Sequence, residues 1–240
     1  MNEDDQIRQV LTDRLREIKR LFDGMPPPAG GVEPPYEGWK EAAPRYRTLL
    51  KIAESIAANL EERDPFKKGH QYRVMDLAGA IGEAMNLDSR RIEGLRVGSL
   101  LHDIGKIFIP SGLLLKPTRL TAAENQLVIT HVRSGNELLQ DIPFPWPVTR
   151  MLLEHHERID GSGYPDGLRG ESLILESRIL AVADVVDAIA SPRSYRPARG
   201  IEVALYDIKG FRGIRYDPDV VDACLMLFEE KNYRLPMDYD

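Results

Sequence analysis

Hydrophobic residues recur at intervals of three and four along most of this chain, as they do on the buried faces of amphipathic helices. No segment shows the sustained alternation of apolar and polar residues that is typical of a half-buried strand. The predicted helices fall at residues 7–22, 49–60, 74–81, 92–105, 121–138, 147–152, 179–189 and 217–228. The pattern therefore predicts an all-α fold.

Local signals mark the start of three of these helices. Thr121 and Glu124 have the spacing of a capping box, in which each side chain satisfies a backbone N–H of the other residue. Pro147 suits a first helical position, and Asp217 followed by Pro218 predicts the start of the last helix.

A segment rich in proline and glycine follows the first predicted helix. Nine of the fifteen residues from Gly24 to Gly38 are proline or glycine, which excludes a helix or strand and indicates a linker or extended loop. We expect an N-terminal helix and linker at residues 1–44 and a helical domain at residues 45–240. The first helix would be only marginally stable alone, so it either packs on its own domain or pairs with a second copy.

Composition and charge exclude several functional classes. The chain has 240 residues, of which 42% are hydrophobic and 29% charged, so it is not disordered throughout. A net charge of −6 provides no field that attracts nucleic acid or an anionic membrane. No apolar run approaches the ~18 residues of a membrane span, and the acidic N-terminus does not resemble a signal peptide, so we expect a cytoplasmic protein. The single cysteine, Cys224, excludes an intrachain disulfide and a zinc site built from thiolates.

Five histidines and two aspartates lie at helical spacing from apolar residues, and each is therefore expected to face the interior. They are His70, His102, Asp103, His131, His155, His156 and Asp184. One inward histidine is more often a hydrogen-bonded core residue than a metal ligand, and one inward aspartate can cap a neighbouring helix. Burying all seven without a metal would cost several kcal/mol for each unpaired charge. A metal centre would satisfy all of them together.

The ligand types limit the class of metal that could bind, but they do not identify a single metal. Imidazole and carboxylate suit Fe, Mn, Co, Ni or Zn. Seven ligands are too many for one ion with open positions, so we expect two ions that share Asp103. Two divalent ions, two aspartates, a bridging hydroxide and one phosphodiester would together carry no net charge, so the centre could hold an anion beside an activated water.

Two further features lie next to these candidates. Lys106 follows Gly105, where the ligand-bearing helix is expected to end; a solvated lysine is the ordinary alternative, but a cation there could meet the charge of a phosphoryl transition state. The glycines and proline of HHERIDGSGYPDGL (155–168) predict a tight loop. It is either a surface turn or, because it follows two candidate ligands, a pocket wall.

Three long motifs resemble the HD-GYP family of bacterial cyclic di-GMP phosphodiesterases. They are HDIGK (102–106), HHERIDGSGYPDGL (155–168) and ILAVADVVDAI (179–189), with DPFKKGH (64–70) before and RYDPDVV (215–221) after in the expected order. The resemblance covers roughly residues 45–230. It implies an all-helical HD domain with a dinuclear centre, often of iron or manganese.

The family's site residues carry over by motif. One ion would be held by His70, His102, Asp103 and Asp184, and the other by Asp103, His131, His155 and His156. Asp103 and Lys106 would be catalytic, with Lys106 on the scissile phosphate. Gly163 and Tyr164 would shape the substrate pocket, and Arg193 and Arg196 match positions that bind the nucleotide.

Three departures from the family pattern bear on these expectations. Phe66 and Lys67 replace a common Tyr-Thr pair, and Pro192 replaces an aspartate before the two arginines. Some members hold a third ion through a glutamate one turn before the first ligand histidine, where this chain has Phe66. A phenyl ring cannot ligate, so we expect two ions, with Phe66 as a hydrophobic wall.

The leading hypothesis is therefore a metal-dependent hydrolysis of cyclic di-GMP by a metal-bridging hydroxide, mainly to linear pGpG rather than on to GMP. One alternative is an HD-type phosphohydrolase for another cyclic dinucleotide, such as a cyclic GMP-AMP. Another is a signalling module of low activity that binds cyclic di-GMP or a diguanylate cyclase; the presence of all seven ligands disfavours it. The partners considered are cyclic di-GMP, a diguanylate cyclase and a second copy bound through the N-terminal helix, with no nucleic acid and no membrane.

Overall fold

The computed structural model describes residues 3–22 and 39–236, so the predicted linker from Gly24 to Gly38 lies outside the described residues. Every regular element within those two ranges is a helix, which confirms the predicted all-α class. The elements are α1 (Glu3–Phe22), α2 (Trp39–Glu62), η1 (Pro65–Lys67), α3 (His70–Ala84), α4 (Ser89–Leu101), η2 (Ile104–Phe108), α5 (Ser111–Leu114), α6 (Ala122–Ile129), α7 (His131–Leu139), α8 (Val148–Glu154), η3 (Gly170–Ser172), α9 (Leu175–Ala190), α10 (Ile201–Gly210) and α11 (Pro218–Glu229).

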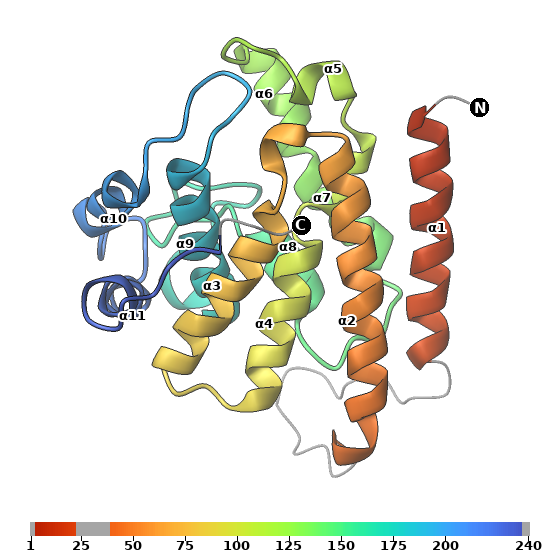
Figure 1. Cartoon of the computed structure of the whole chain (residues 1–240), viewed down its shortest axis with the longest axis horizontal. Coiled ribbons are helices and arrows are strands. Elements are labelled where there is room, and N and C mark those ends of the chain that lie inside the picture. Colours follow the sequence, from red (N-terminus) through yellow and green to blue (C-terminus); the bar gives the residue numbers. More distant parts are fainter. Residues whose placement is uncertain (1–2, 23–38, 237–240) are drawn as a thin grey trace.

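Helices α2, α3 and α4 form the centre of the molecule (Figure 1). Helix α1 lies along the outer side of α2. Helices α9 and α11 pack on the other side of α3, and α10 packs on α9. Two clusters of buried apolar side chains hold this arrangement together. The first includes Ile18, Leu49 and Leu100, and the second includes Leu77 and Ile179. Helices α4 and α8 contribute to both clusters and so connect them.

The N-terminal helix packs on its own domain. Its apolar face, formed by Ile7, Leu11, Ile18 and Phe22, is buried in the first cluster, and the Phe22 ring meets Phe144 edge to face at 5.8 Å. This confirms the simpler of the two alternatives for α1. Helix α2 begins at Trp39, so the expected boundary between residues 44 and 45 lies inside it.

Several predicted helix boundaries are wrong. Helix α2 begins ten residues before the predicted start at residue 49, and α3 begins four residues before the predicted start at residue 74. The segment 121–138 contains two helices, α6 and α7, with Thr130 between them, and no residue of α6 is buried. The ligand-bearing helix α4 ends at Leu101, and the short 3₁₀ helix η2 contains Gly105. Gly105 instead permits the close approach of α7 to η2, since a Cβ atom on it would lie 1.9 Å from the carbonyl oxygen of His131.

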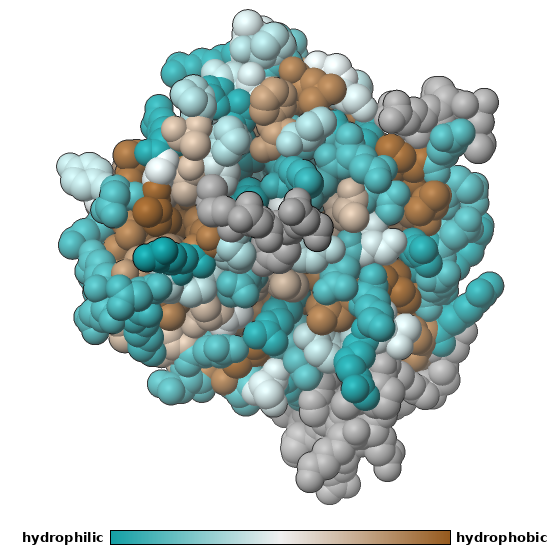
Figure 2. Space-filling view, in the orientation of Figure 1, coloured by the Kyte–Doolittle hydropathy of each residue, from teal (hydrophilic) through white to brown (hydrophobic). Residues whose placement is uncertain are grey.

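The caps predicted at Thr121 and Asp217 are present, whereas Pro147 is the N-cap of α8 and not its first residue. Thr121 and Glu124 form the reciprocal capping box, and the Asp217 side chain accepts hydrogen bonds from two N–H groups of the first turn of α11. On the face shown in Figure 2, the patches of hydrophobic residues are small and are separated by hydrophilic residues. Among the described helices, none combines the length and the apolar character that a membrane span requires.

Candidate metal centre

The seven predicted ligands converge at the junction between the two apolar clusters. They come from five places: the start of α3, the end of α4, the start of α7, the end of α8 and the middle of α9. Their ligand atoms form three overlapping groups in which all atoms lie within 4.8 Å of one another: His70, His102 and Asp184; His102, Asp103 and His155; and His131, His155 and His156.

Asp103 lies between the two ends of this arrangement. Its Oδ2 is 3.8 Å from Nε2 of His70 and 3.6 Å from Nε2 of His102, whereas its Oδ1 is 3.4 Å from Nε2 of His131. At one end, Asp184 Oδ1 is 3.5 Å from Nε2 of His70. The two carboxylate oxygens of Asp103 therefore face different groups of imidazoles, which is the geometry that a shared ligand requires.

The histidine rings are oriented by hydrogen bonds on their outer nitrogens. Nδ1 of His102, His131 and His155 each lies 2.6–2.7 Å from the carbonyl oxygen three residues earlier in the chain. A carbonyl only accepts, so each Nδ1 carries the proton and each Nε2 keeps a lone pair. His70 is held from a different direction, with Nδ1 2.6 Å from Oδ2 of Asp187, and Arg73 binds the same carboxylate.

The inner atoms fit a metal because they lack other partners. Nε2 of His70, His102, His131 and His155 and Oδ1 of Asp103 are buried and accept no hydrogen bond. Buried polar atoms are rarely left in this state unless an ion or ordered water completes the site. Four such imidazole nitrogens, whose rings are held at Nδ1, and one carboxylate oxygen form a donor set that could hold a metal ion.

Burial keeps the imidazoles of His70, His131, His155 and His156 neutral and therefore able to bind a metal. Loss of solvation lowers the pKa of His70 and of His131 to about 4, with Lys67 adding to the effect at His70 and Lys106 at His131. Loss of solvation also lowers the pKa of His155 and His156 well below its usual value.

The carboxylates of the centre stay ionised. Burial raises the pKa of Asp103, but Lys106 and Lys67 outweigh that effect and lower it well below its usual value. At Asp184, burial acts in the same upward direction, and His102 and His70 overcome it to lower the pKa.

Comparison with known proteins agrees with this geometry. The family model described as HD domain matches residues 54–220. The chain belongs to the HD domain family. A relative named "Cyclic di-GMP phosphodiesterase response regulator RpfG", from Xanthomonas campestris pv. campestris, is 42% identical over 180 residues, which cover 74% of this chain and 47% of the relative. A relative named "3′3′-cGAMP-specific phosphodiesterase 3", from Vibrio cholerae, is 32% identical over 193 residues, covering 79% of this chain and 42% of the relative.

The chain thus spans less than half the length of these two relatives. Among solved structures, "Bd1817, a HDG"Y"P protein from Bdellovibrio bacteriovorus" has a similar fold, with a TM-score of 0.60 and 15% identity over 95% of this chain and 73% of that one. The resemblance of the sequence motifs to HD-GYP phosphodiesterases is confirmed. HD domains are a metal-dependent family, and the His/Asp clusters of this chain could bind metal ions.

Beside the HD-domain centre lies a cavity of about 330 Å³. Lys106 and Tyr164, both expected at the substrate site, line it, and Phe66 forms part of its rim with 45% of its surface exposed. Lys106 Nζ is 2.5 Å from Oδ2 of Asp103, and loss of solvation lowers the pKa of Lys106 to about 8. Arg193 and Tyr195 also line this cavity.

Arg193 and Arg196, the two arginines expected to bind the nucleotide, differ in how many hydrogen bonds already hold their guanidinium groups. Both line the cavity, but the Arg196 guanidinium donates to the carbonyl oxygens of Ala188, Ile189 and Ser191 at the end of α9. The Arg193 side chain makes one long contact, 3.5 Å from Nε to the oxygen of Ala188. Arg196 is therefore engaged as a helix cap.

The loop after the two histidines is folded around a buried carboxylate. Glu157 accepts hydrogen bonds from the N–H groups of residues 166–168. Gly163 does not line the cavity; a Cβ there would lie 2.4 Å from Cα of Glu157, so the glycine permits the loop to pack on this turn. The loop thereby places the Tyr164 ring 4.8 Å from the His156 ring, and burial raises the pKa of Tyr164.

Sequence reasoning missed several residues that build the centre. Glu61 accepts hydrogen bonds from the N–H groups of Gly69 and Gln71 and so fixes the start of α3. The Arg63 side chain binds the carbonyl oxygens of Lys106 and Ile109 and fixes η2. The inward orientation of Asp187 could have been predicted from the sequence, because it lies three residues after Asp184 on the same apolar helix.

Lys67 was noted only as a departure from the family motif. Its Nζ lies 2.8 Å from Oδ2 of Asp103. Burial lowers its pKa, but Asp103 outweighs that effect and the pKa of Lys67 is raised, so it carries a charge.

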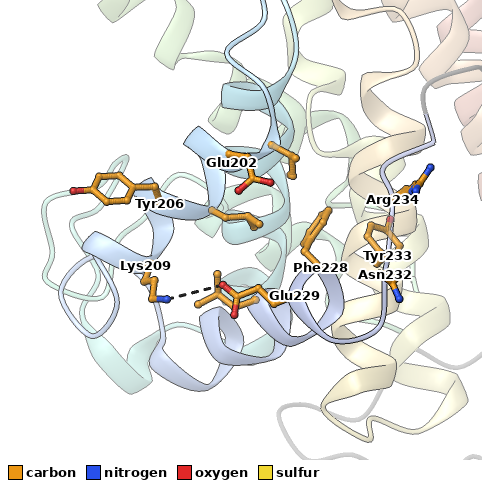
Figure 3. A pocket seen from close by; sticks show the side chains of 11 residues that line it. Glu202, Tyr206, Lys209, Phe228, Glu229, Asn232, Tyr233 and Arg234 are labelled. Atoms are coloured by element: carbon orange, nitrogen blue, oxygen red, sulfur yellow. Dashed lines mark ion pairs between the residues drawn. The ribbon is translucent and has the colours of Figure 1, made fainter.

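A second and larger cavity lies elsewhere. It has a volume of about 440 Å³ and is formed by α10, α11 and residues 232–234, with Lys209 and Glu229 3.9 Å apart at its edge (Figure 3). It shares no residue with the metal centre.

Proposed function

We propose that this HD domain hydrolyses cyclic di-GMP, mainly to linear pGpG. The observation that carries the proposal is the position of Asp103 between two groups of buried imidazoles, with a lysine and a cavity beside it. The relative named as a cyclic di-GMP phosphodiesterase supports the choice of substrate.

The centre would hold two divalent ions, iron or manganese. His70, His102, Asp103 and Asp184 would bind one ion, and Asp103, His131, His155 and His156 the other. When bound, such ions polarise a phosphoryl oxygen and activate a water as the nucleophile. Phe66 on the rim provides no lone pair for a third ion.

The chain's own residues would position the substrate. Lys106 donates to the phosphate that is cut, and its charge is most valuable where negative charge develops in the transition state. Arg193 reaches into the cavity and can bind a phosphate or a guanine edge. Tyr164, buried against His156, forms a wall that keeps the substrate at the centre.

Hydrolysis is proposed to stop mainly after one cut. Opening the ring requires one in-line attack at one phosphodiester, and the linear product must then rebind in a new register before a second cut. We therefore expect pGpG to accumulate.

The test is to incubate anaerobically purified protein, loaded with iron or manganese, with a panel of cyclic dinucleotides and to separate the products by chromatography. Cyclic di-GMP should be consumed fastest, with pGpG as the main product. Asp103→Ala should lose most of the metal and all activity; near-normal turnover of that variant would refute the assignment. Rapid formation of GMP with little pGpG would refute the product alone.

A cyclic GMP-AMP is the second candidate substrate. The relative named as specific for 3′3′-cGAMP, at 32% identity, favours it. The same panel distinguishes the two, because preferential consumption of the mixed dinucleotide would replace cyclic di-GMP in the proposal. Binding of cyclic di-GMP without turnover by the metal-loaded protein would instead indicate a signalling module.

Protein partners remain predictions. A second copy bound through α1 would have to use the outer face of this helix, because its apolar face is already buried on α2. Light scattering of the full chain over a range of concentrations tests this, and a pull-down with a purified diguanylate cyclase tests the other partner.

A further inference from the structure

Lys67 places a second ammonium group at the proposed metal centre. It is the last residue of η1, only 13% of its side chain is exposed, and its Nζ is 2.8 Å from Oδ2 of Asp103. Lys106 Nζ is 2.5 Å from the same oxygen. Two ammonium groups that share one carboxylate oxygen must be close neighbours, and both line the 330 Å³ cavity.

The backbone around Lys67 is fixed, so the side chain is not a solvated one that happens to lie nearby. The N–H of Lys67 donates to the carbonyl oxygen of Asp64 at 2.8 Å. Glu61 of α2 binds the N–H of Gly69, two residues after the end of η1. The segment that carries Lys67 is therefore held to α2 on one side and leads into the first ligand histidine on the other.

Charge balance indicates what these two lysines bind. One carboxylate oxygen faces two cations, and Asp103 is also the ligand proposed to be shared by two metal ions. Once both of its oxygens bind ions, the two ammonium groups need another anion. The other lysine on the cavity wall, Lys116, differs because its Nζ already pairs with the Glu124 carboxylate at 2.7 Å.

We propose that Lys67 is a second phosphate-binding catalytic residue that acts as a pair with Lys106. A phosphodiester has two non-bridging oxygens, and two neighbouring ammonium groups can donate to one each. During hydrolysis water adds to phosphorus, the P–O3′ bond breaks, and the proton lost by the water goes to the leaving O3′. Both lysines stay protonated and stabilise the charge that develops on the non-bridging oxygens.

The inference rests on the proposed function for the identity of the substrate, but its binding test uses inorganic phosphate in place of that substrate. Wild-type protein, Lys67→Met and the control Lys68→Met are loaded with Mn²⁺, and the affinity for inorganic phosphate is measured by calorimetry. Lys68 is the exposed neighbour and does not line the cavity. The metal content of each protein is measured in parallel.

Lys67→Met should retain the metal content of the wild type and bind phosphate at least about tenfold more weakly, because it loses a hydrogen bond from a charged donor. Lys68→Met should behave as the wild type. Unchanged phosphate affinity in Lys67→Met would overturn the proposal. Loss of Mn²⁺ together with phosphate would also overturn it, because Lys67 would then serve to build the centre.

Hydrolysis separates this inference from the proposed function. If the wild type binds Mn²⁺ and phosphate but cuts no cyclic dinucleotide, the proposed function fails and the role of Lys67 in phosphate binding stands. If Lys67→Met hydrolyses cyclic di-GMP at the rate of the wild type, the proposed function stands and Lys67 is not catalytic.

Discussion

A histidine binds a metal well only when one ring nitrogen is free and the other is held. Here the carbonyl oxygens of Ser99, Val128 and Leu152 hold three of the rings, each from within the same turn of chain. These carbonyls lie in the last turns of helices, where acceptors have no helical partner. The orientation of three ligands is therefore determined locally, by where each helix stops.

The role of Lys106 can be separated from that of the ligands. Lys106→Ala should keep both ions but slow hydrolysis, since a donor aimed at developing charge is worth ~3 kcal/mol, or roughly a hundredfold in rate. Metal analysis and steady-state kinetics on the same preparation test this. Loss of metal from Lys106→Ala would show that the lysine is structural.

The two arginines should respond differently to substitution. Arg193→Ala should raise KM more than it lowers kcat, because its guanidinium faces the cavity with few bonds to the protein. Arg196→Ala should in addition lower the melting temperature, because it removes the donors that cap α9. Equal melting temperatures for the two variants would show that the cap adds nothing measurable.

Acid should destabilise the metal-free protein. His70 and His131 have a pKa of about 4 when folded, against an ordinary value of 6.5. Between these values the unfolded chain binds more protons than the folded protein, so the free energy of unfolding falls as the pH drops from about 6.5 to 4. The loss is on the order of 3 kcal/mol for each group and is complete below pH 4. Urea unfolding at pH 7 and at pH 4.5 measures it; equal values would mean that the two imidazoles are not buried neutral.

At the scale of elements, the contact between η2 and α7 brings His131 to Asp103. A Cβ on Gly105 would lie 1.9 Å from the His131 carbonyl oxygen and 2.6 Å from the backbone nitrogen of Gly135. Gly105→Ala should therefore displace α7, destabilise the fold by several kcal/mol and weaken binding of the ion that we propose for His131. Gly112→Ala is the matched control, because its Cβ would meet nothing within 4 Å. Equal metal content and equal melting temperatures in the two variants would contradict this account.

The sequence was informative about elements and much less so about contacts between them. Helical spacing was enough to predict that five histidines and two aspartates face the interior, because side chains on one face of a helix recur at a fixed interval. No such rule connects Lys67 with Asp103, since their contact depends on how η1 passes the end of α4. A lysine in a polar loop also ordinarily lies in solvent.

Gly105 shows the same limit. A glycine near a predicted helix end usually caps that helix. Here it leaves space for a helix that begins 26 residues later in the chain. Only the folded structure shows which neighbour needs the space.

At the scale of the whole molecule, the ligands connect the two apolar clusters. The helix of His131 contributes to the first cluster, whereas the helices of His70 and Asp184 contribute to the second. Ions that bind only the folded protein stabilise it by about 2.7 kcal/mol per site at a hundredfold excess over Kd. Saturating Mn²⁺ should therefore raise the melting temperature by roughly 5–10 °C per site. Asp103→Ala should abolish most of this shift, and an equal shift in that variant would place the ions elsewhere.

The junction between the clusters also determines how the metal-free molecule opens. Its middle contains buried nitrogen lone pairs with no donor, so water can enter there at a lower cost than into either apolar cluster. Amide hydrogens at the start of α7 and at the end of α8 should then exchange with solvent by a partial opening, while those in the centre of α3 exchange only on global unfolding. With ions bound, we expect the amide hydrogens at the start of α7 and at the end of α8 also to exchange only on global unfolding. The domain would then unfold as a single cooperative unit only when metal ions occupy its centre.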